Sequence, residues 1–332
     1  MLSFSIGKPI AIVRGGMFHG KYLRVYDPQL YPDVPNEEMW SDPMDMLSDW
    51  GFFDNLKTQP KKNFEGLRKA LITATKQPLD PEIKDLYEAA TEVLNNMSRK
   101  IFSLMDGELE LMPNPDKHKR EQLWIASPTG SGKTFFALKF MAKYQHMFGR
   151  EVFIVTKNMR DQTIKHFVTL PQDDPDFVDP NVINWSERVR LPGTNRTQYK
   201  LVVDPLQMSE FKNSALLWDD IEYMPDKDLE EALEKARDDS MGVGRHDNIT
   251  VLNTGHLLTN YKKTRKILSE ADYVVVYPQG GTSRGLDYFL KDYLGSDSKI
   301  TNKRIKDLKS RWVCFHCKYP KFVLHAHGCF MI

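Results

Sequence analysis

Short apolar runs alternate with helical patterns along the chain from Gln122 onward. Six of these runs have the length and composition of buried strands: 123–126, 152–155, 201–203, 215–218, 249–252 and 273–277. Apolar residues recur with helical spacing in four further segments: 133–147, 226–239, 257–270 and 284–294. Continuous apolar strands separated by helices are typical of a buried parallel sheet. The pattern therefore predicts an α/β fold with a mostly parallel sheet flanked by helices.

The first 110 residues have a different pattern. They combine strand-like runs at 10–13 and 22–25 with helical patterns at 63–76 and 81–105. Near the other end of the chain, 311–315 and 321–324 have the pattern of two strands. We predict two regions: an N-terminal mixed α+β extension of unknown role at 1–110, and a domain at 111–332 that closes with a β-hairpin.

A glycine-rich segment, Ser127-Pro-Thr-Gly-Ser-Gly-Lys-Thr134, joins the first apolar run to the first helical pattern. Strand, glycine-rich turn and helix are the context that predicts a phosphate-binding loop. The two glycines let the backbone approach phosphate oxygens, and the start of the helix favours negative charge. Lys133 can reach the β- and γ-phosphates of a nucleotide, and the Thr134 hydroxyl can bind Mg²⁺. The usual pattern begins with Gly where this chain has Ser. All members of the loop are candidates for binding the nucleotide: Ser127, Pro128, Thr129, Gly130, Ser131, Gly132, Lys133 and Thr134.

Two carboxylates follow the apolar run at 215–218. Asp219 is placed to hold Mg²⁺, directly or through water, opposite Thr134. Asp220 is then placed to orient and polarise an attacking water. Glu222 is an alternative for that task, because alternation along an extended chain points it to the same side as Asp220.

A basic pair bounded by glycine, Gly244-Arg-His246, precedes the run at 249–252. Arg245 can insert its guanidinium beside the γ-phosphate of a neighbouring subunit, although spacing alone favours an exposed turn residue. Polar residues end the same run, and each can sense the γ-phosphate or the attacking water: Asn253, Thr254 and His256.

Taken in order, these motifs resemble the genome-packaging ATPases of large double-stranded DNA viruses, the poxvirus-type branch of the FtsK/HerA superfamily. The matching segments are Pro128 to Thr134, Leu216 to Asp220, Gly244 to Val251, Tyr273 to Pro278, and Ser310-Arg-Trp-Val313 at the closing hairpin. The likeness covers residues 120–332, and residues 1–110 match no family that we can name.

The resemblance implies a RecA/ASCE-like P-loop ATPase that uses ATP and Mg²⁺ and pumps duplex DNA of any sequence into a capsid. It implies a homo-oligomeric ring, a hexamer, with a capsid or portal-vertex protein as partner, working in the host-cell cytoplasm and in the virion. The roles implied are phosphate and metal binding for Lys133 and Thr134, metal support for Asp219, water activation for Asp220 and a trans-acting finger for Arg245. The family usually ends the strand after that arginine with Gln, where this chain has His256 nearby.

Other functions share parts of the pattern. A HerA-like translocase or helicase in DNA processing would have the same catalytic residues. A scaffold that binds nucleotide without motor activity would follow if Asp219 and Asp220 were only a solvated turn. A small-molecule kinase usually opens with its phosphate loop, whereas here about 120 residues precede it. The chain has neither the Asn-Lys-x-Asp motif of GTPases nor the Leu-Ser-Gly-Gly signature of ABC-type ATPases.

The tail offers an alternative chemistry, a tetrahedral zinc site with thiolate and imidazole ligands. Its candidate ligands are Cys314, Cys317, His327 and Cys329. Cys314 and Cys317 have opposite strand parity, so an extended hairpin would point them to different faces. The pattern therefore favours a hairpin without metal.

Composition adds limits. The chain has 332 residues and a formal net charge of +1, so contact with nucleic acid requires a local basic patch. No apolar stretch is long enough to cross a bilayer, and three cysteines make no disulfide framework. The candidates for DNA contact are Lys299, Lys303, Arg304, Lys306, Lys309 and Arg311 near the tail, Lys117, Lys119 and Arg120 before the phosphate loop, and Arg188, Arg190 and Arg196 between the second and third sheet runs. For the first two clusters we favour a solvated helix face over DNA contact.

Overall fold

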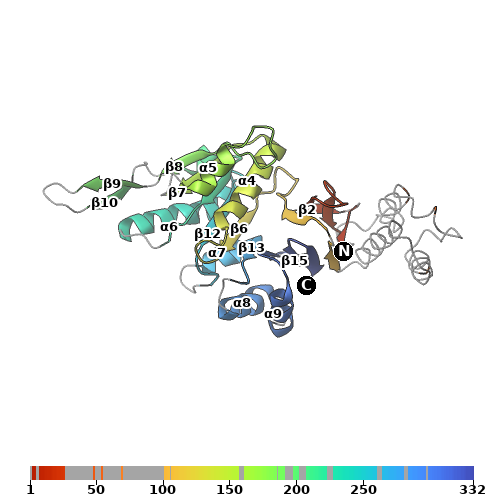
Figure 1. Ribbon diagram of the computed structural model, residues 1–332. Coiled ribbons are helices and arrows are strands. Elements are labelled where there is room, and N and C mark those ends of the chain that lie inside the picture. Colours follow the sequence, from red (N-terminus) through yellow and green to blue (C-terminus); the bar gives the residue numbers. More distant parts are fainter. Residues whose placement is uncertain are drawn as a thin grey trace. The chain divides into compact units, whose positions relative to one another are not determined.

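The structure is a computed structural model, and it divides into two compact units (Figure 1). One unit comprises Met1–Leu111 together with Pro320–Ile332, and the other comprises Met112–Tyr319. The residues that the structure describes are 2–4, 7–26, the single residues Ser48, Asp54 and Lys69, 101–104, 106–156, 161–184, 186–190, 197–201, 207–222, 227–259, 264–279, 283–296 and 298–332. The division into functional domains at 1–110 and 111–332 stays a prediction.

Seven strands of the larger unit lie side by side in the order β14-β13-β6-β12-β11-β7-β8. They are β6 (Gln122–Ala126), β7 (Val152–Thr156), β8 (Asn181–Asn184), β11 (Ala215–Trp218), β12 (Thr250–Gly255), β13 (Tyr273–Val276) and β14 (Val313–His316). All neighbours are parallel except β14, which runs antiparallel to β13. The four strands β13, β6, β12 and β11 are buried along their whole length, which explains their continuous apolar sequence. The predicted mostly parallel α/β fold is confirmed.

Helices fill the connections between these strands. The described ones are α4 (Lys133–Phe148), α5 (Gln162–Val168), α6 (Lys227–Gly242), α7 (Arg265–Glu270), α8 (Ser283–Phe289) and α9 (Ser298–Asp307), with 3₁₀ turns η2 (Met208–Phe211) and η3 (Val243–Arg245) and the π-helix η4 (Leu290–Leu294). Helix α4 packs across β6, β11 and β12 with α5 beside it, whereas α7 packs against β6 and α6 (Figure 1). The fold therefore sets the start of α4 at the carboxyl end of β6.

Two segments of the larger unit differ from the sequence prediction. The run at 201–203 was predicted to form the third strand of the main sheet. Its first residue, Leu201, is instead the last residue of β10 (Thr197–Leu201), which pairs with β9 (Ser186–Arg190) in a separate antiparallel sheet. Residues 202–203 lie outside the described part. The predicted helix at 257–270 is wrong at its beginning, because 257–259 are not helical; α7 (Arg265–Glu270) forms its last part, and 260–263 lie outside the described residues. The Leu258 carbonyl instead accepts a hydrogen bond from Trp124 Nε1 at 3.3 Å.

The smaller unit contains two groups of strands. One is ordered β1-β3-β2-β5, and the other places β16 between β4 and β15. Their bounds are β1 (Leu2–Ser3), β2 (Lys8–Arg14), β3 (Tyr22–Val25), β4 (Ile101–Ser103), β5 (Glu108–Leu111), β15 (Phe322–His325) and β16 (Gly328–Met331). The strands predicted at 10–13 and 22–25 are confirmed. The helix predicted to continue to 105 is wrong at 101–103, where pairing with β16 forms β4.

The rest of the two predicted N-terminal helices, apart from Lys69, lies outside the described residues. Within the described ranges, no helix is both long enough and apolar enough to span a membrane.

Candidate active site

The glycine-rich segment lies between β6 and α4, at the carboxyl end of β6. Gly130 has φ of 78° and Gly132 has φ of 107°, in the left-handed region that favours glycine. A Cβ added at Gly130 would meet no atom within 4 Å, so the backbone there is open to a ligand. The Ser127 amide donates to Gly255 O at 3.0 Å, which ties the start of the loop to the end of β12. The segment has the open, glycine-bent backbone that a phosphate group requires.

Lys133 is the buried cation of this loop. Its ammonium donates to Ser127 O at 2.8 Å and lies 3.9 Å from Asp220 Oδ1. The Ser127 hydroxyl is also buried, and its Oγ has no hydrogen-bond partner in the described part of the chain. A buried donor without a partner costs about 1–3 kcal/mol. The loop thus keeps one polar hydrogen that an incoming oxygen can accept.

Asp219 ends β11 and is buried beside the loop. Its Oδ1 accepts hydrogen bonds from Thr134 Oγ1 and from Thr254 Oγ1, both at 3.1 Å. Burial, and then the neighbouring charge of Asp220, raise the pKa of Asp219 to about 6, against the opposing effect of the two hydroxyl bonds. The structure therefore brings together the two residues that were assigned to Mg²⁺ from the sequence.

Asp220 and Glu222 face different partners. Asp220 has φ of 49°, and its Oδ1 lies 3.5 Å from His256 Nε2 and 3.9 Å from Lys133 Nζ. Glu222 Oε2 instead accepts a hydrogen bond from the His256 backbone amide at 3.1 Å. Asp220 is therefore directed at the lysine of the loop, while Glu222 is bound to the end of β12.

The polar residues that end β12 separate into two groups. Thr254 Oγ1 accepts a hydrogen bond from the Asp220 amide at 3.0 Å and donates one to Asp219. The His256 ring lies 3.5 Å from Thr129 Oγ1. Asn253 is buried and donates to Met241 Sδ at 3.7 Å. Thr254 and His256 therefore belong to the site, whereas the Asn253 amide contacts Met241, and its role as a sensor stays a prediction.

Sequence reasoning missed two side chains at the loop. The Tyr277 hydroxyl donates to Gly132 O at 2.9 Å, and Arg311 Nε donates to Ser131 O at 3.0 Å. Burial raises the pKa of Tyr277 far above its ordinary value, with the Arg311 charge opposing that rise, so the phenol stays a donor. The sequence pattern groups Arg311 with the basic residues for DNA contact, whereas in the structure its guanidinium contacts the loop. The positions of both residues at the carboxyl end of β13 and just before β14 were the available signal.

The site suits a nucleotide with a divalent cation. Open glycine backbone, a buried ammonium and an unpaired hydroxyl suit phosphate oxygens. The Thr134 hydroxyl and the Asp219 carboxylate supply the oxygen ligands that Mg²⁺ prefers.

Arg245 is not part of this cluster. It is exposed on η3, before the amino end of β12, whereas the loop lies at the carboxyl ends of the same parallel strands. Val251 pairs with Gln122 and Gly255 with Ala126, so almost the full length of β12 separates the two. Arg245 therefore cannot reach the loop of its own chain.

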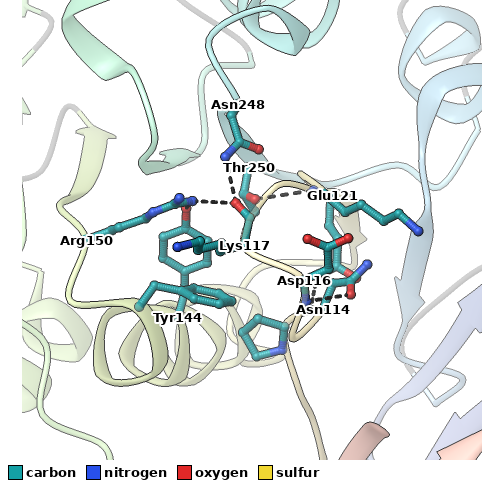
Figure 2. Close-up of a pocket in the computed structure, with 11 residues that line it drawn as sticks. Asn114, Asp116, Lys117, Glu121, Tyr144, Arg150, Asn248 and Thr250 are labelled. Atoms are coloured by element: carbon teal, nitrogen blue, oxygen red, sulfur yellow. Dashed lines mark hydrogen bonds between the residues drawn. The ribbon is translucent and has the colours of Figure 1, made fainter. Parts of the chain in front are cut away.

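A pocket near this turn explains how the turn is held (Figure 2). Asn248, with φ of 55°, donates from Nδ2 to Lys117 O at 2.8 Å, and Arg150 donates to the same carbonyl at 2.9 Å. On the other side of the pocket Glu121 accepts from the Asn114 amide at 2.7 Å. These bonds fix the end of the turn that carries Arg245. The predicted DNA contact of Arg120 finds no support, since its guanidinium donates to Ser240 O and Met241 O.

Comparison with known proteins gives the family. A family model described as type III restriction enzyme, res subunit (ResIII), matches residues 83–275, more than half of the chain. The chain belongs to this ResIII family. The match includes the loop, both aspartates, Arg245 and His256.

Two viral proteins are among those similar to the chain. The uncharacterized protein V3 of Sputnik virophage is 28% identical over 226 residues, which cover 67% of this chain and 81% of V3. The genome packaging NTPase B204 of Sulfolobus turreted icosahedral virus 2, in complex with ATP-gammaS, is 12% identical with a TM-score of 0.35, covering 65% of this chain and 98% of B204. Its complex with AMP has a TM-score of 0.34 at 12% identity, covering 62% and 94%.

The tail of this ResIII protein gives no support to the zinc alternative. Cys314 and Cys329 are buried in β14 and β16, and Cys317 is half-buried. Burial raises the pKa of the Cys329 thiol far above its ordinary value, which disfavours the thiolate that zinc requires. Among the described residues, no group of three or more His, Cys, Asp and Glu side chains, His327 included, is arranged to hold a metal ion.

Asp219→Asn should stabilise the metal-free protein in a pH-dependent way. The raised pKa means that the folded protein binds a proton more readily than the unfolded chain, so wild-type stability falls as pH rises from about 4 to about 6. Asparagine keeps an acceptor for both hydroxyls and carries no charge. We expect the free energy of unfolding of the variant to exceed that of wild type by about 1–3 kcal/mol at pH 8. This difference should shrink as the pH falls toward about 4.

Urea unfolding in the presence of a chelator measures this difference across the pH range. Asp176→Asn is the control, because Asp176 forms a partly exposed ion pair with Lys139 at 3.4 Å. A gap for Asp219→Asn that does not change with pH would show that burial does not perturb this carboxylate.

Proposed function

We propose that this chain hydrolyses ATP, uses the energy to move double-stranded DNA, and packages a viral genome into its capsid. The observation that carries the proposal is the 3.1 Å contact between Thr134 and Asp219, beside the buried ammonium of Lys133. A hydroxyl after a phosphate-loop lysine and an acidic strand end are the pair that holds Mg²⁺ in P-loop NTPases. Membership of the ResIII family supports nucleotide hydrolysis.

Each side chain has its own task in the proposed mechanism. The loop amides and Lys133 bind the phosphates, and Thr134 with Asp219 would hold Mg²⁺, which when bound draws negative charge from the phosphate oxygens. Lys133 is already in place before the reaction, because Ser127 O holds its ammonium at 2.8 Å. A donor that needs no rearrangement stabilises the charge that grows in the transition state most effectively.

Asp220 is the residue that we assign to the attacking water. Its carboxylate is partly exposed and is directed at Lys133, so water has access to it where the phosphates would lie. His256 lies 3.5 Å from the same oxygen and acts as a positioning residue for Asp220. Glu222 stays the alternative, although the His256 amide already occupies one of its oxygens.

A homo-oligomeric ring, a hexamer, completes the site in this proposal. Arg245 lies far from its own loop but is exposed on a fixed turn, which suits a residue that enters the site of the neighbouring subunit. Candidate DNA contacts are the exposed basic residues on or near α9: Lys299, Lys303, Arg304, Lys306 and Lys309. Arg188 and Arg190 of β9 remain candidates for a pore loop, and Arg196 lies outside the described residues.

The packaging role itself rests on the motif resemblance. In this proposal the protein works at the viral assembly site in the host-cell cytoplasm and in the virion, with a capsid or portal-vertex protein as partner. A DNA-processing translocase is the second candidate, and the ResIII match favours it because that family is described by a restriction-enzyme subunit. The scaffold alternative requires a solvated Asp219, whereas Asp219 is buried and bonded to Thr134.

Duplex DNA should stimulate ATP turnover by the purified protein, and the protein should displace a third strand from a triplex as it moves. Single-stranded DNA of the same length is the control for simple polyanion binding. Further stimulation by empty capsids supports packaging, and stimulation by a nuclease partner supports DNA processing. ATP turnover that ignores duplex DNA, with no triplex displacement, contradicts a translocase of either kind.

A further inference from the structure

Arg311 reaches Ser131 of the phosphate-binding loop from 180 residues away in sequence. Its Nε donates to Ser131 O at 3.0 Å. A Cβ added at Gly132 would lie 3.2 Å from Arg311 Nη2 and 3.8 Å from the Tyr277 hydroxyl. A cationic fork therefore lies directly against the residue that precedes Lys133.

The segment that carries Arg311 is held on both sides. Trp312 packs edge-to-face on Phe136 of α4, with ring centroids 5.1 Å apart. Ser310 is buried and its hydroxyl donates to Trp312 O at 2.7 Å. Val313 then pairs with Val276 at the start of β14. The backbone of Arg311 is thus fixed by the first turns of α4 and by the sheet, while its side chain stays exposed.

This exposed guanidinium is only partly used by the protein. Within the described part of the chain, its one hydrogen bond goes from Nε to Ser131 O, which leaves the N–H groups on both Nη atoms available. Guanidinium forks bind phosphate in a bidentate way and keep their charge at all physiological pH values. The Nε bond fixes the plane of the fork, so little side-chain entropy remains to be lost when an oxyanion binds.

We propose that Arg311 is a second cationic ligand for the phosphates of the bound nucleotide, supplied by the same chain as the loop. The inference rests on the proposed nucleotide site and adds a residue to it. It separates Arg311 from the basic residues around α9, which stay the candidates for DNA contact. It also separates Arg311, acting within its own chain, from Arg245, which lies at the other end of the sheet.

Calorimetric titration of the full chain with ATP-gammaS tests the inference. Arg311→Gln keeps a donor for Ser131 O but loses the charge, and Arg311→Lys keeps the charge but loses the fork. Lys291→Gln is the matched control, since Lys291 is exposed on η4 and its replacement changes net charge equally. We expect Arg311→Gln to weaken binding about ten- to hundredfold, Arg311→Lys less, and Lys291→Gln by less than about twofold.

The salt dependence of ATP-gammaS affinity distinguishes a phosphate ligand from a residue that only supports the loop. If Arg311 only supports the loop, its replacement leaves this salt dependence unchanged. Loss of a phosphate contact lowers the sensitivity of binding to salt, so the slope should be shallower for Arg311→Gln than for wild type. Wild-type affinity in Arg311→Gln, or weakened binding with the wild-type salt slope in both Arg311 variants, would overturn the inference and leave the loop assignment intact. Failure of the wild-type protein to bind ATP-gammaS, or full binding by Lys133→Ala, would instead overturn the proposed site and the inference with it.

Discussion

Lys133→Ala abolishes ATP turnover: we expect kcat/KM to fall by about 10³-fold or more. Its ammonium is buried at the base of the loop and bonded to Ser127 O at 2.8 Å, so no solvent ion of similar charge can take its place at the same distance. The loop amides and Asp219 remain, but the charge that develops on the phosphates loses its preorganised counter-charge. Steady-state phosphate release with and without duplex DNA measures the effect.

Lys139→Ala is the matched control for that experiment. Lys139 lies in the same helix and pairs with Asp176 at 3.4 Å at a partly exposed position. Its loss should change turnover by less than about twofold, because an exposed ion pair contributes about 0–1 kcal/mol. Both variants should unfold cooperatively at temperatures close to wild type. DNA-stimulated turnover that persists in folded Lys133→Ala would show that the loop between β6 and α4 is not the hydrolytic site.

Much of this site could be predicted because its parts are local in sequence. A strand, a glycine-rich turn and a helix that follow each other within about 25 residues leave little choice of arrangement. Asp219 is distant from Thr134 in sequence, yet parallel strands bring their carboxyl ends to one edge of the sheet. Once β6 and β11 were recognised as strands of one sheet, the contact between the two residues followed.

The rest depended on which segments pair, and apolar periodicity does not contain that information. Tyr277 and Arg311 reach the loop only because β13 lies beside β6 and β14 beside β13. Charge alone placed Arg311 with its basic neighbours, since the packing of Trp312 on Phe136 cannot be read from spacing. In the same way, the apolar pattern at 201–203 predicts a strand but does not say which strand it pairs with. In the structure β10 pairs with β9 and is not part of the main sheet.

Arg245→Ala should bind ATP with nearly wild-type affinity and fail to hydrolyse it. Nothing in the loop of the same chain contacts Arg245, which is exposed beyond the amino end of β12. Nucleotide affinity should therefore change by less than about threefold, whereas turnover should fall by about 10³-fold, the usual effect of losing an arginine finger. His246→Ala, an exposed neighbour on the same turn, is the control and should retain turnover. Equilibrium titration and steady-state turnover on the same preparations separate binding from chemistry.

Mixed rings decide whether the effect crosses a subunit interface. Asp220→Asn inactivates the loop of its own subunit but leaves Arg245 intact, and Arg245→Ala has the opposite defect. In a head-to-tail ring, an Arg245→Ala loop beside an Asp220→Asn subunit recovers every catalytic group, so an equal mixture should regain about a quarter of wild-type turnover if the sites act independently. Each variant alone should stay inactive. If the mixture also stays inactive while forming rings, Arg245 acts through the fold of its own turn, where Asn248 binds Lys117 O, and the finger assignment is wrong. Asp220 and Arg245 lie at opposite ends of the sheet within one subunit. Turnover can therefore recover only if Asp220 of one subunit and Arg245 of its neighbour act in the same site.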